Sequence, residues 1–205
     1  MKTPSHIKIK HSKRARRVAL RLDPIERVFH LVVPKGMSLS RAQSFAQTQE
    51  DWMQEKLNAL APKITFSDGA VISILGNRTT IKIHQTPDLR ITKIILEDNI
   101  LHVRTNKPDA SARIERFLKT MIKDELSRLA HEKAERIGKT IASICVRDTK
   151  SRWGSCSIDR TLSFSWRLIF APLESFDYVV AHEVAHLKHL DHSKSFWALC
   201  RELSD

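Results

Sequence analysis

Short apolar and β-branched stretches, separated by turn signals, dominate the first half of the chain. Residues 17–22 and 27–33 flank an Asp-Pro-Ile-Glu turn and predict a β-hairpin. Four more strands are expected, at 71–75, 80–84, 91–96 and 100–104. One helix interrupts them: Ser38 or Ser40 can cap it, its apolar residues follow helical spacing to about Leu60, and Pro62 ends it. We therefore predict that residues 1–106 form a β-rich region with one helix.

Near residue 106 the pattern changes from strand to helix periodicity. Apolar residues recur at three-and-four spacing from Ile114 to Ile137, with Pro108 at the first helical position and Gly138 as the stop. Three short strands are expected next, at 143–148, 152–157 and 162–168. Pro172 then opens a second helix, and a short one begins near Ser193. The fold class is thus α+β, with a second domain at 107–205 and no internal repeat.

The helix opened by Pro172 contains the pattern H-E-x-x-H at residues 182–186. At about 100° per residue, His182 and His186 lie only about 40° apart and one turn along, so both imidazoles can reach one ion. Glu183 lies about 100° round from His182, where it can address a water on the metal without being a ligand. The opposite side of the helix is a continuous apolar face, made of Leu173, Phe176, Val180, Val184 and Leu187.

A third histidine separates this pattern from an ordinary amphipathic helix with polar residues on its solvent face. His192 follows a break expected near 190–191, and a chain that leaves the helix there can bring it back to the ion. Three histidines with one position open to water match a catalytic zinc site. Two rivals for the third ligand remain: His189, which would stand about 10 Å along the helix axis from His182 and is better placed at the rim, and Glu202.

Several motifs in the last quarter of the chain resemble those of the YgjP-like metallopeptidases, zincins related to the WLM and SprT-like groups. They are Arg-Trp-Gly-Ser-Cys-Ser at 152–157, Trp-Arg-Leu at 166–168, the segment 177–186, and His192-Ser193 with Phe196-Trp197. The resemblance implies a zincin core, a Zn²⁺ ion held by His182, His186 and His192, and Glu183 as general base. It also implies that a sheet edge beside the active helix can hold an extended peptide.

Two departures distinguish this chain from the metzincins, which share the ligand spacing. His189 stands where those enzymes turn on glycine, and no methionine follows Met121, so a Met-turn is absent. The metzincin label therefore does not apply.

Residues outside the metal motif are candidates for substrate binding. Trp153, Gly154 and Ser155 suggest a strand that another backbone can approach closely, although a strand turn with Trp153 in the core fits as well. A donor to the oxyanion of the reaction is expected from Arg152, Tyr178 or His189, while a tyrosine at position 178 can also pack against the sheet.

Charge adds a possible second partner. The net charge is +12, and between residues 1 and 35 ten lysines and arginines face only Asp23 and Glu26. Such a segment suits a nucleic acid or another polyanion, or it keeps the protein soluble.

Three functions remain open: a peptidase acting on peptides or proteins, a zinc hydrolase of nucleotides or other phosphorylated substrates, and a nucleic-acid-associated protease. With three scattered cysteines and no apolar run long enough for a membrane span, we expect a cytoplasmic protein.

Overall fold

The computed structural model describes residues 7–60, 64–149 and 152–204, and the chain divides into two compact units, Met1–Lys63 and Ile64–Asp205. The fold is α+β, with strands concentrated in the first half and helices in the second, as predicted. The expected boundary near residue 106 falls inside the second unit. The reason is that the strands before it share one hydrophobic core with the helices after it.

The first unit contains a three-stranded sheet. Its strands are β1 (Ile7–Ser12), β2 (Ala19–Asp23) and β3 (Val28–Pro34), in the order β1-β3-β2. The predicted hairpin is confirmed as the antiparallel pair of β2 and β3, whose turn is held by Asp23: its Oδ1 accepts the backbone N–H groups of Ile25 and Glu26 at 3.1 Å. Strand β1, which the sequence analysis did not predict, lies parallel to β3.

Two short helices replace the single helix expected after Ser38. They are α1 (Leu39–Gln47), which Ser38 caps, and α2 (Glu50–Asn58). At the break between them, the Thr48 hydroxyl donates at 2.8 Å to the Phe45 carbonyl, the acceptor that a continuous helix would offer to the backbone N–H of Gln49. That N–H turns to Ala46 instead, at 3.1 Å.

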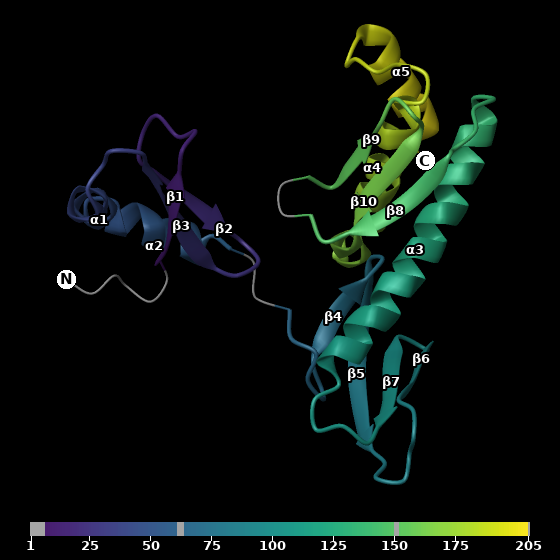
Figure 1. Ribbon diagram of the computed structural model, residues 1–205. Helices are drawn as coiled ribbons and strands as arrows, with labels where there is room; N and C mark the ends of the chain where they lie inside the picture. The colour runs from purple at the N-terminus through teal and green to yellow at the C-terminus, as the bar shows by residue number, and fades with distance from the viewer. Residues whose placement is uncertain (1–6, 61–63, 150–151, 205) are drawn as a thin grey trace. The chain divides into compact units, whose positions relative to one another are not determined.

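The second unit begins with a four-stranded sheet, against which the N-terminal part of a long helix lies (Figure 1). Its strands are β4 (Val71–Ile74), β5 (Asn77–Gln85), β6 (Lys93–Glu97) and β7 (Ile100–Thr105), in the order β4-β5-β7-β6. The long helix α3 (Ser111–Arg136) starts later than predicted, because Asp109 accepts the N–H of Ser111 at 2.8 Å and Pro108 lies outside it. Gly138, at φ 63°, ends it as expected.

A second small sheet and three helical segments complete this unit. They are β8 (Ser143–Arg147), β9 (Gly154–Cys156), β10 (Thr161–Ser165), the 3₁₀ helix η1 (Trp166–Phe170), α4 (Leu173–Ala185) and α5 (Lys194–Leu203). The strand order is β8-β10-β9, so β9 lies at an edge. The strand predicted to reach residue 168 stops at Ser165, where the Ser165 hydroxyl accepts the N–H of Arg167 and starts η1.

A buried lysine joins three helices of the second unit. Lys133 of α3 is fully buried, and its ammonium group lies 2.7 Å from a carboxylate oxygen of Asp177 on α4. The same group donates to the backbone carbonyl of Leu203 at the end of α5. Since a buried charge needs both a counter-charge and hydrogen bonds, these partners fix the mutual positions of the three helices. No helix among the described residues is long and apolar enough to cross a bilayer.

Candidate active site

Helix α4 ends earlier than the sequence suggested, and this early end shapes the site. The helix stops at Ala185, and the chain then closes tighter turns: the backbone N–H groups of Leu187 and Lys188 reach back three residues. The break expected near 190–191 is therefore wrong by about one turn. The predicted apolar back face is confirmed at its centre, where Phe176, Val180 and Val184 are buried, but Leu173 is exposed.

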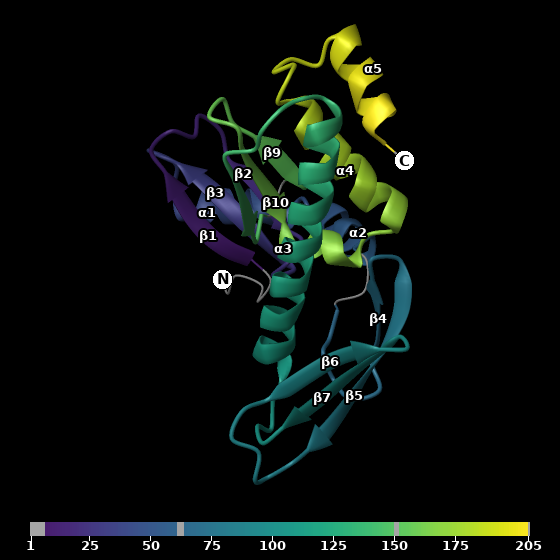
Figure 2. The ribbon, with the colours of Figure 1, turned by 90° about the vertical axis from the view of Figure 1, so that its right-hand side faces the viewer.

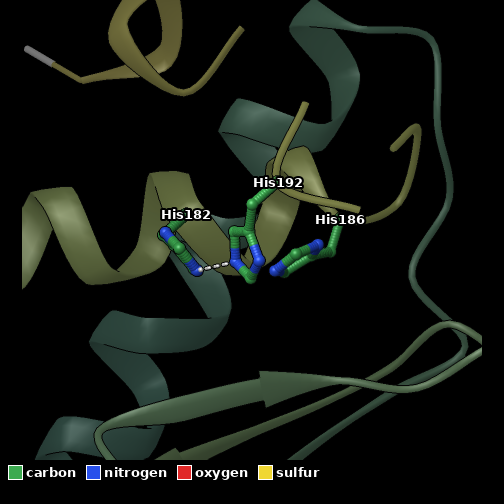
Figure 3. A group of neighbouring side chains, drawn as sticks. All are labelled: His182, His186 and His192. Carbon is green, nitrogen blue, oxygen red and sulfur yellow. Dashed lines mark hydrogen bonds between the residues drawn. The ribbon is translucent and has the colours of Figure 1, made fainter. Parts of the chain in front are cut away.

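The side chains of three histidines meet beyond the end of α4. His182 lies in the last turn, His186 caps the helix, and His192 belongs to the loop before α5. One side-chain nitrogen from each lies within 4.8 Å of the others, and the Nε2 atoms of His182 and His192 are 3.3 Å apart. Figure 3 shows His192 between the two other rings, with all three pointing toward one place. Among the described residues this is the group suited to a metal ion, and it does not include Glu202.

The tautomer of His186 is set by a hydrogen bond to the backbone. Its Nδ1 lies 2.9 Å from the carbonyl oxygen of His189, so Nδ1–H donates and Nε2 keeps a free lone pair. His189 thus contributes its carbonyl to the site. Because α4 ends before it, His189 does not continue the helical face of His182 and His186, which was the premise for considering it as a ligand.

Burial favours the neutral form of His182. Its pKa is lowered by desolvation first and by the neighbouring His186 and His192 second. Its Nδ1 is buried and has no hydrogen-bond partner in the described part of the chain. A neutral imidazole is the form that binds a metal, so the environment prepares this ring for ligation.

Two aromatic side chains of α5 enclose the histidines. The buried ring of Phe196 stacks on His186 at 4.5 Å between centroids and meets His182 and His192 edge-on. Trp197, which is 40 % exposed, stacks on His192 at 5.6 Å. The sequence analysis used Phe196 and Trp197 only as part of a family resemblance. Both residues lie in the first turn of α5, three and four residues after its N-cap Ser193. Their closeness to His192 in the sequence was the signal that could have placed them near the histidines.

Glu183 is buried beneath strand β9. It is only 6 % exposed, and burial raises its pKa to about 7, against the opposing effect of Arg152. The backbone of Gly154 lies directly against it: a Cβ atom at position 154 would stand 2.5 Å from Cγ and Oε1 of Glu183. Glycine is therefore required at this place because the Glu183 side chain occupies the space.

The five residues predicted to bind substrate lie around this part of the molecule. Gly154 and Ser155 belong to the edge strand β9, where they pair with β10 on one side. Arg152 is exposed at the start of that strand and near enough to Glu183 to influence its charge. Trp153 is 53 % exposed, which contradicts the alternative that placed it in the core.

Tyr178 is the fifth of these residues and lies on α4. It is 44 % exposed, and its ring centroid is 6.1 Å from that of His182. It therefore does not pack into the interior against the sheet. The site has exposed aromatic rings on two elements, with Tyr178 on α4 and Trp197 on α5.

Cys156 ends β9 but is not prepared for chemistry. Burial, together with the charges of Glu183 and Asp159, raises its pKa to about 11. Since the thiolate is the nucleophilic form, this thiol is unreactive at neutral pH. Cys156 therefore does not compete with Glu183 as the reactive group next to the histidines.

Comparison with known families agrees with this arrangement. The family described as "YgjP-like, metallopeptidase domain" matches residues 16–205, which is nearly the whole chain and includes parts of both compact units. No curated protein and no solved structure matches the chain.

Proposed function

Because the chain belongs to the YgjP-like metallopeptidase family, we propose that it hydrolyses peptide bonds with a zinc ion held by His182, His186 and His192. The observation that carries the proposal is the convergence of three imidazole nitrogens within 4.8 Å, next to a buried glutamate. Metallopeptidases act on peptides or proteins. We assign Zn²⁺ as the ion, the three histidines as its ligands and Glu183 as the general base.

Zinc suits this set of donors. All three are imidazoles, the ligand type common to catalytic zinc sites, which bind the ion through three protein ligands and leave one position open. The hydrogen bond from His186 to the His189 carbonyl supports the assignment, since metal-binding histidines almost always donate their other N–H in this way.

Glu183 would act as the general base. A bound zinc ion supplies Lewis-acid chemistry, polarising the substrate carbonyl and acidifying water. Glu183 then accepts the proton of the attacking water on its carboxylate and passes it to the leaving amine. Its burial supports this role, because in the metal-free site desolvation raises the pKa of the carboxyl to about 7 and so makes it a stronger base than an exposed glutamate.

The substrate would bind along β9. An edge strand can accept an extended peptide as an additional strand, and β9 lies against Glu183 through Gly154. Arg152, Trp153 and Ser155 would contact the peptide from this strand. For the oxyanion, Tyr178 is the best-placed donor because its ring lies beside His182, with Arg152 and the side chain of His189 as alternatives.

A substrate screen on the zinc-loaded protein tests the proposal. We expect peptides to be released from casein and no phosphate from nucleoside triphosphates, with Glu183→Gln as the inactive control. Release of phosphate in place of peptides would favour the alternative function, a zinc hydrolase of nucleotides or other phosphorylated substrates.

A nucleic-acid-associated protease is the second candidate, and one loop favours it. Lys13, Arg14, Arg16 and Arg17 are all exposed between β1 and β2. Binding of DNA or RNA by this loop would weaken steeply between about 50 and 200 mM salt, because counterions compete for the phosphates. The double variant Arg16→Glu/Arg17→Glu should bind more weakly still. If the protein has no affinity at low salt, the loop serves solubility only.

A further inference from the structure

A groove runs between strand β6 and helix α3, away from the histidines. Its volume is about 390 Å³, and it is lined by Ile91, Thr92, Ile94, Arg113, Arg116, Phe117 and Thr120. Figure 2 shows β6 at the margin of its sheet, next to the N-terminal part of α3. The groove therefore has a strand edge along one wall and a helix along the other.

The strand wall can accept another strand. β6 pairs only with β7, so it is an edge of the four-stranded sheet, and no backbone hydrogen bond joins its free side to another described segment. An edge strand presents unpaired N–H and C=O groups that can extend the sheet. Two large apolar side chains here face solvent: Ile91 is 77 % exposed and Ile95 is 58 % exposed.

The floor of the groove continues the interior of the sheet. Ile94 lies opposite the buried Val103 and on the same face, and Phe117 of α3 packs against the same core. In an added strand every second side chain would point to this face, because side chains alternate along a strand. An apolar residue at such a position would cover Ile94 and Phe117.

The helix wall is cationic. Arg116 is exposed and makes no ion pair with the described residues, while Arg113 influences the charge of Asp109 at the start of the helix. Two guanidinium groups above an apolar floor complement carboxylates that stand beside apolar side chains. A nucleic acid would use the charges but not the apolar floor or the strand edge.

We propose that this groove binds an extended polypeptide segment that adds a strand to β6 and carries apolar and acidic residues in turn at every second position, so that both kinds face α3. Such a segment would recruit protein substrates to the peptidase, a role that rests on the function proposed above. The binding itself does not depend on the metal site, because none of the residues lining the groove belongs to it.

The binding test uses the full chain with the substitution Glu183→Gln, so that the probe is not cleaved. A labelled twelve-residue peptide with threonine at every odd position, and valine and glutamate in turn at the even positions, should bind saturably, and its counterpart with lysine in place of glutamate should not. The double variant Arg113→Glu/Arg116→Glu should weaken binding at least tenfold. Glutamate near the start of α3 is compatible with the helix, since it complements the helix dipole.

The matched control is Lys123→Glu/Lys139→Glu, which reverses two exposed charges on or just after α3 outside the groove. It should change the dissociation constant less than twofold. Amide hydrogen exchange should slow in residues 93–97 when the peptide binds. Equal weakening by both double variants, no saturable binding, or protection confined to the basic loop at 13–17 would overturn the proposal.

Recruitment is tested separately with the active protein. Arg113→Glu/Arg116→Glu should raise KM for a protein substrate that carries an acidic-apolar segment and leave kcat/KM for a short peptide unchanged. If the inactive protein binds the probe and the active one cleaves nothing, the peptidase proposal fails and the proposal of peptide binding in the groove remains. An equal loss for both substrates would contradict a recruiting role.

Discussion

The two sheets of the second unit repeat one arrangement of strands but differ in what their edges carry. In β5-β7-β6 and in β8-β10-β9, the third strand lies in the middle, parallel to the first and antiparallel to the second. The sheet β1-β3-β2 of the first unit has the same arrangement, and each of the three is followed by a helical segment. Strand topology alone therefore does not determine where the chemistry lies.

The helix after each sheet makes the difference. Helix α4 places Glu183 against the edge strand β9, which leaves no room for a side chain at Gly154. Helix α3 instead leaves the edge strand β6 free, with an open groove beside it. Strand β9 therefore adjoins the candidate catalytic groups, whereas β6 borders only a groove. Substitutions at both strands can test this difference.

The largest expected effect is on catalysis at the β9 side. Glu183→Gln keeps the size of the side chain but cannot accept a proton, and general-base catalysis is typically worth about 10²–10⁴ in rate. We expect kcat for peptide hydrolysis to fall by that factor while zinc content, measured by atomic absorption, is unchanged. Hydrolysis near the wild-type rate by the zinc-loaded variant would remove Glu183 from the mechanism.

The next effect concerns the metal. Structural zinc sites with four protein ligands bind the ion with free energies of roughly 10–16 kcal/mol. Each ligand therefore contributes about 3 kcal/mol, which is about a hundredfold in affinity. His192→Ala should therefore weaken zinc binding about a hundredfold in a competition titration, and Glu202→Ala should leave it unchanged. The opposite pattern would move the third ligand to Glu202.

Burial of Glu183 should also appear in the pH dependence of stability. Its pKa is raised from 4.5 to about 7 in the folded protein, and this difference corresponds to about 3 kcal/mol. The stability it contributes is present below pH 4.5 and is lost as the pH rises through about 7. Chemical denaturation of the metal-free proteins should show Glu183→Gln to be more stable than wild type above pH 7 and equal to it at pH 4.5. If the free energies of unfolding of the two proteins differ by the same amount at both pH values, titration of this carboxyl is not the cause.

The smallest expected effect concerns the close contact between Gly154 and Glu183, which is present at β9 and has no counterpart at β6. Gly154→Ala would push a Cβ atom into the Glu183 carboxyl, and a small misplacement of a catalytic group costs about tenfold to a hundredfold in rate. We expect kcat to fall at least tenfold with zinc retained, while Ser163→Ala on the neighbouring strand β10 has little effect. If the two variants are equally active, the close approach of Gly154 has no catalytic role.

Local patterns indicated that three residues of the candidate site lie on or at the end of one helix. The period of α4 placed His182, Glu183 and His186 on the helix, and its buried residues agree with the apolar face expected from the same period. The assignment of His192 as the third ligand stays a prediction. Its position beside the other two depends on the early end of α4, which no glycine or proline marks in the sequence.

Contacts between distant segments could not be predicted in this way. The requirement for glycine at position 154 comes from Glu183, 29 residues later in the chain, so the sequence suggested close approach without naming the partner. At the break between α1 and α2, the backbone N–H of Gln49 bonds to Ala46 rather than to Phe45, a local change that the apolar spacing does not reveal. The expected domain boundary near residue 106 stays a prediction, because apolar periodicity does not reveal that the strands before it share one core with the helices after it.

The loop between α4 and α5 would give a metal bound by the histidines a mechanical role as well. An ion shared by His186 and His192 would close a ring of only seven residues, and a ring this short costs little chain entropy. The ion would act as a reversible cross-link that pins the start of α5, while Lys133 pins its end through the Leu203 carbonyl. Removal of the metal would release one of these two attachments and leave the other in place. Metal supply would then govern how firmly this last helix is anchored as well as whether the enzyme is active.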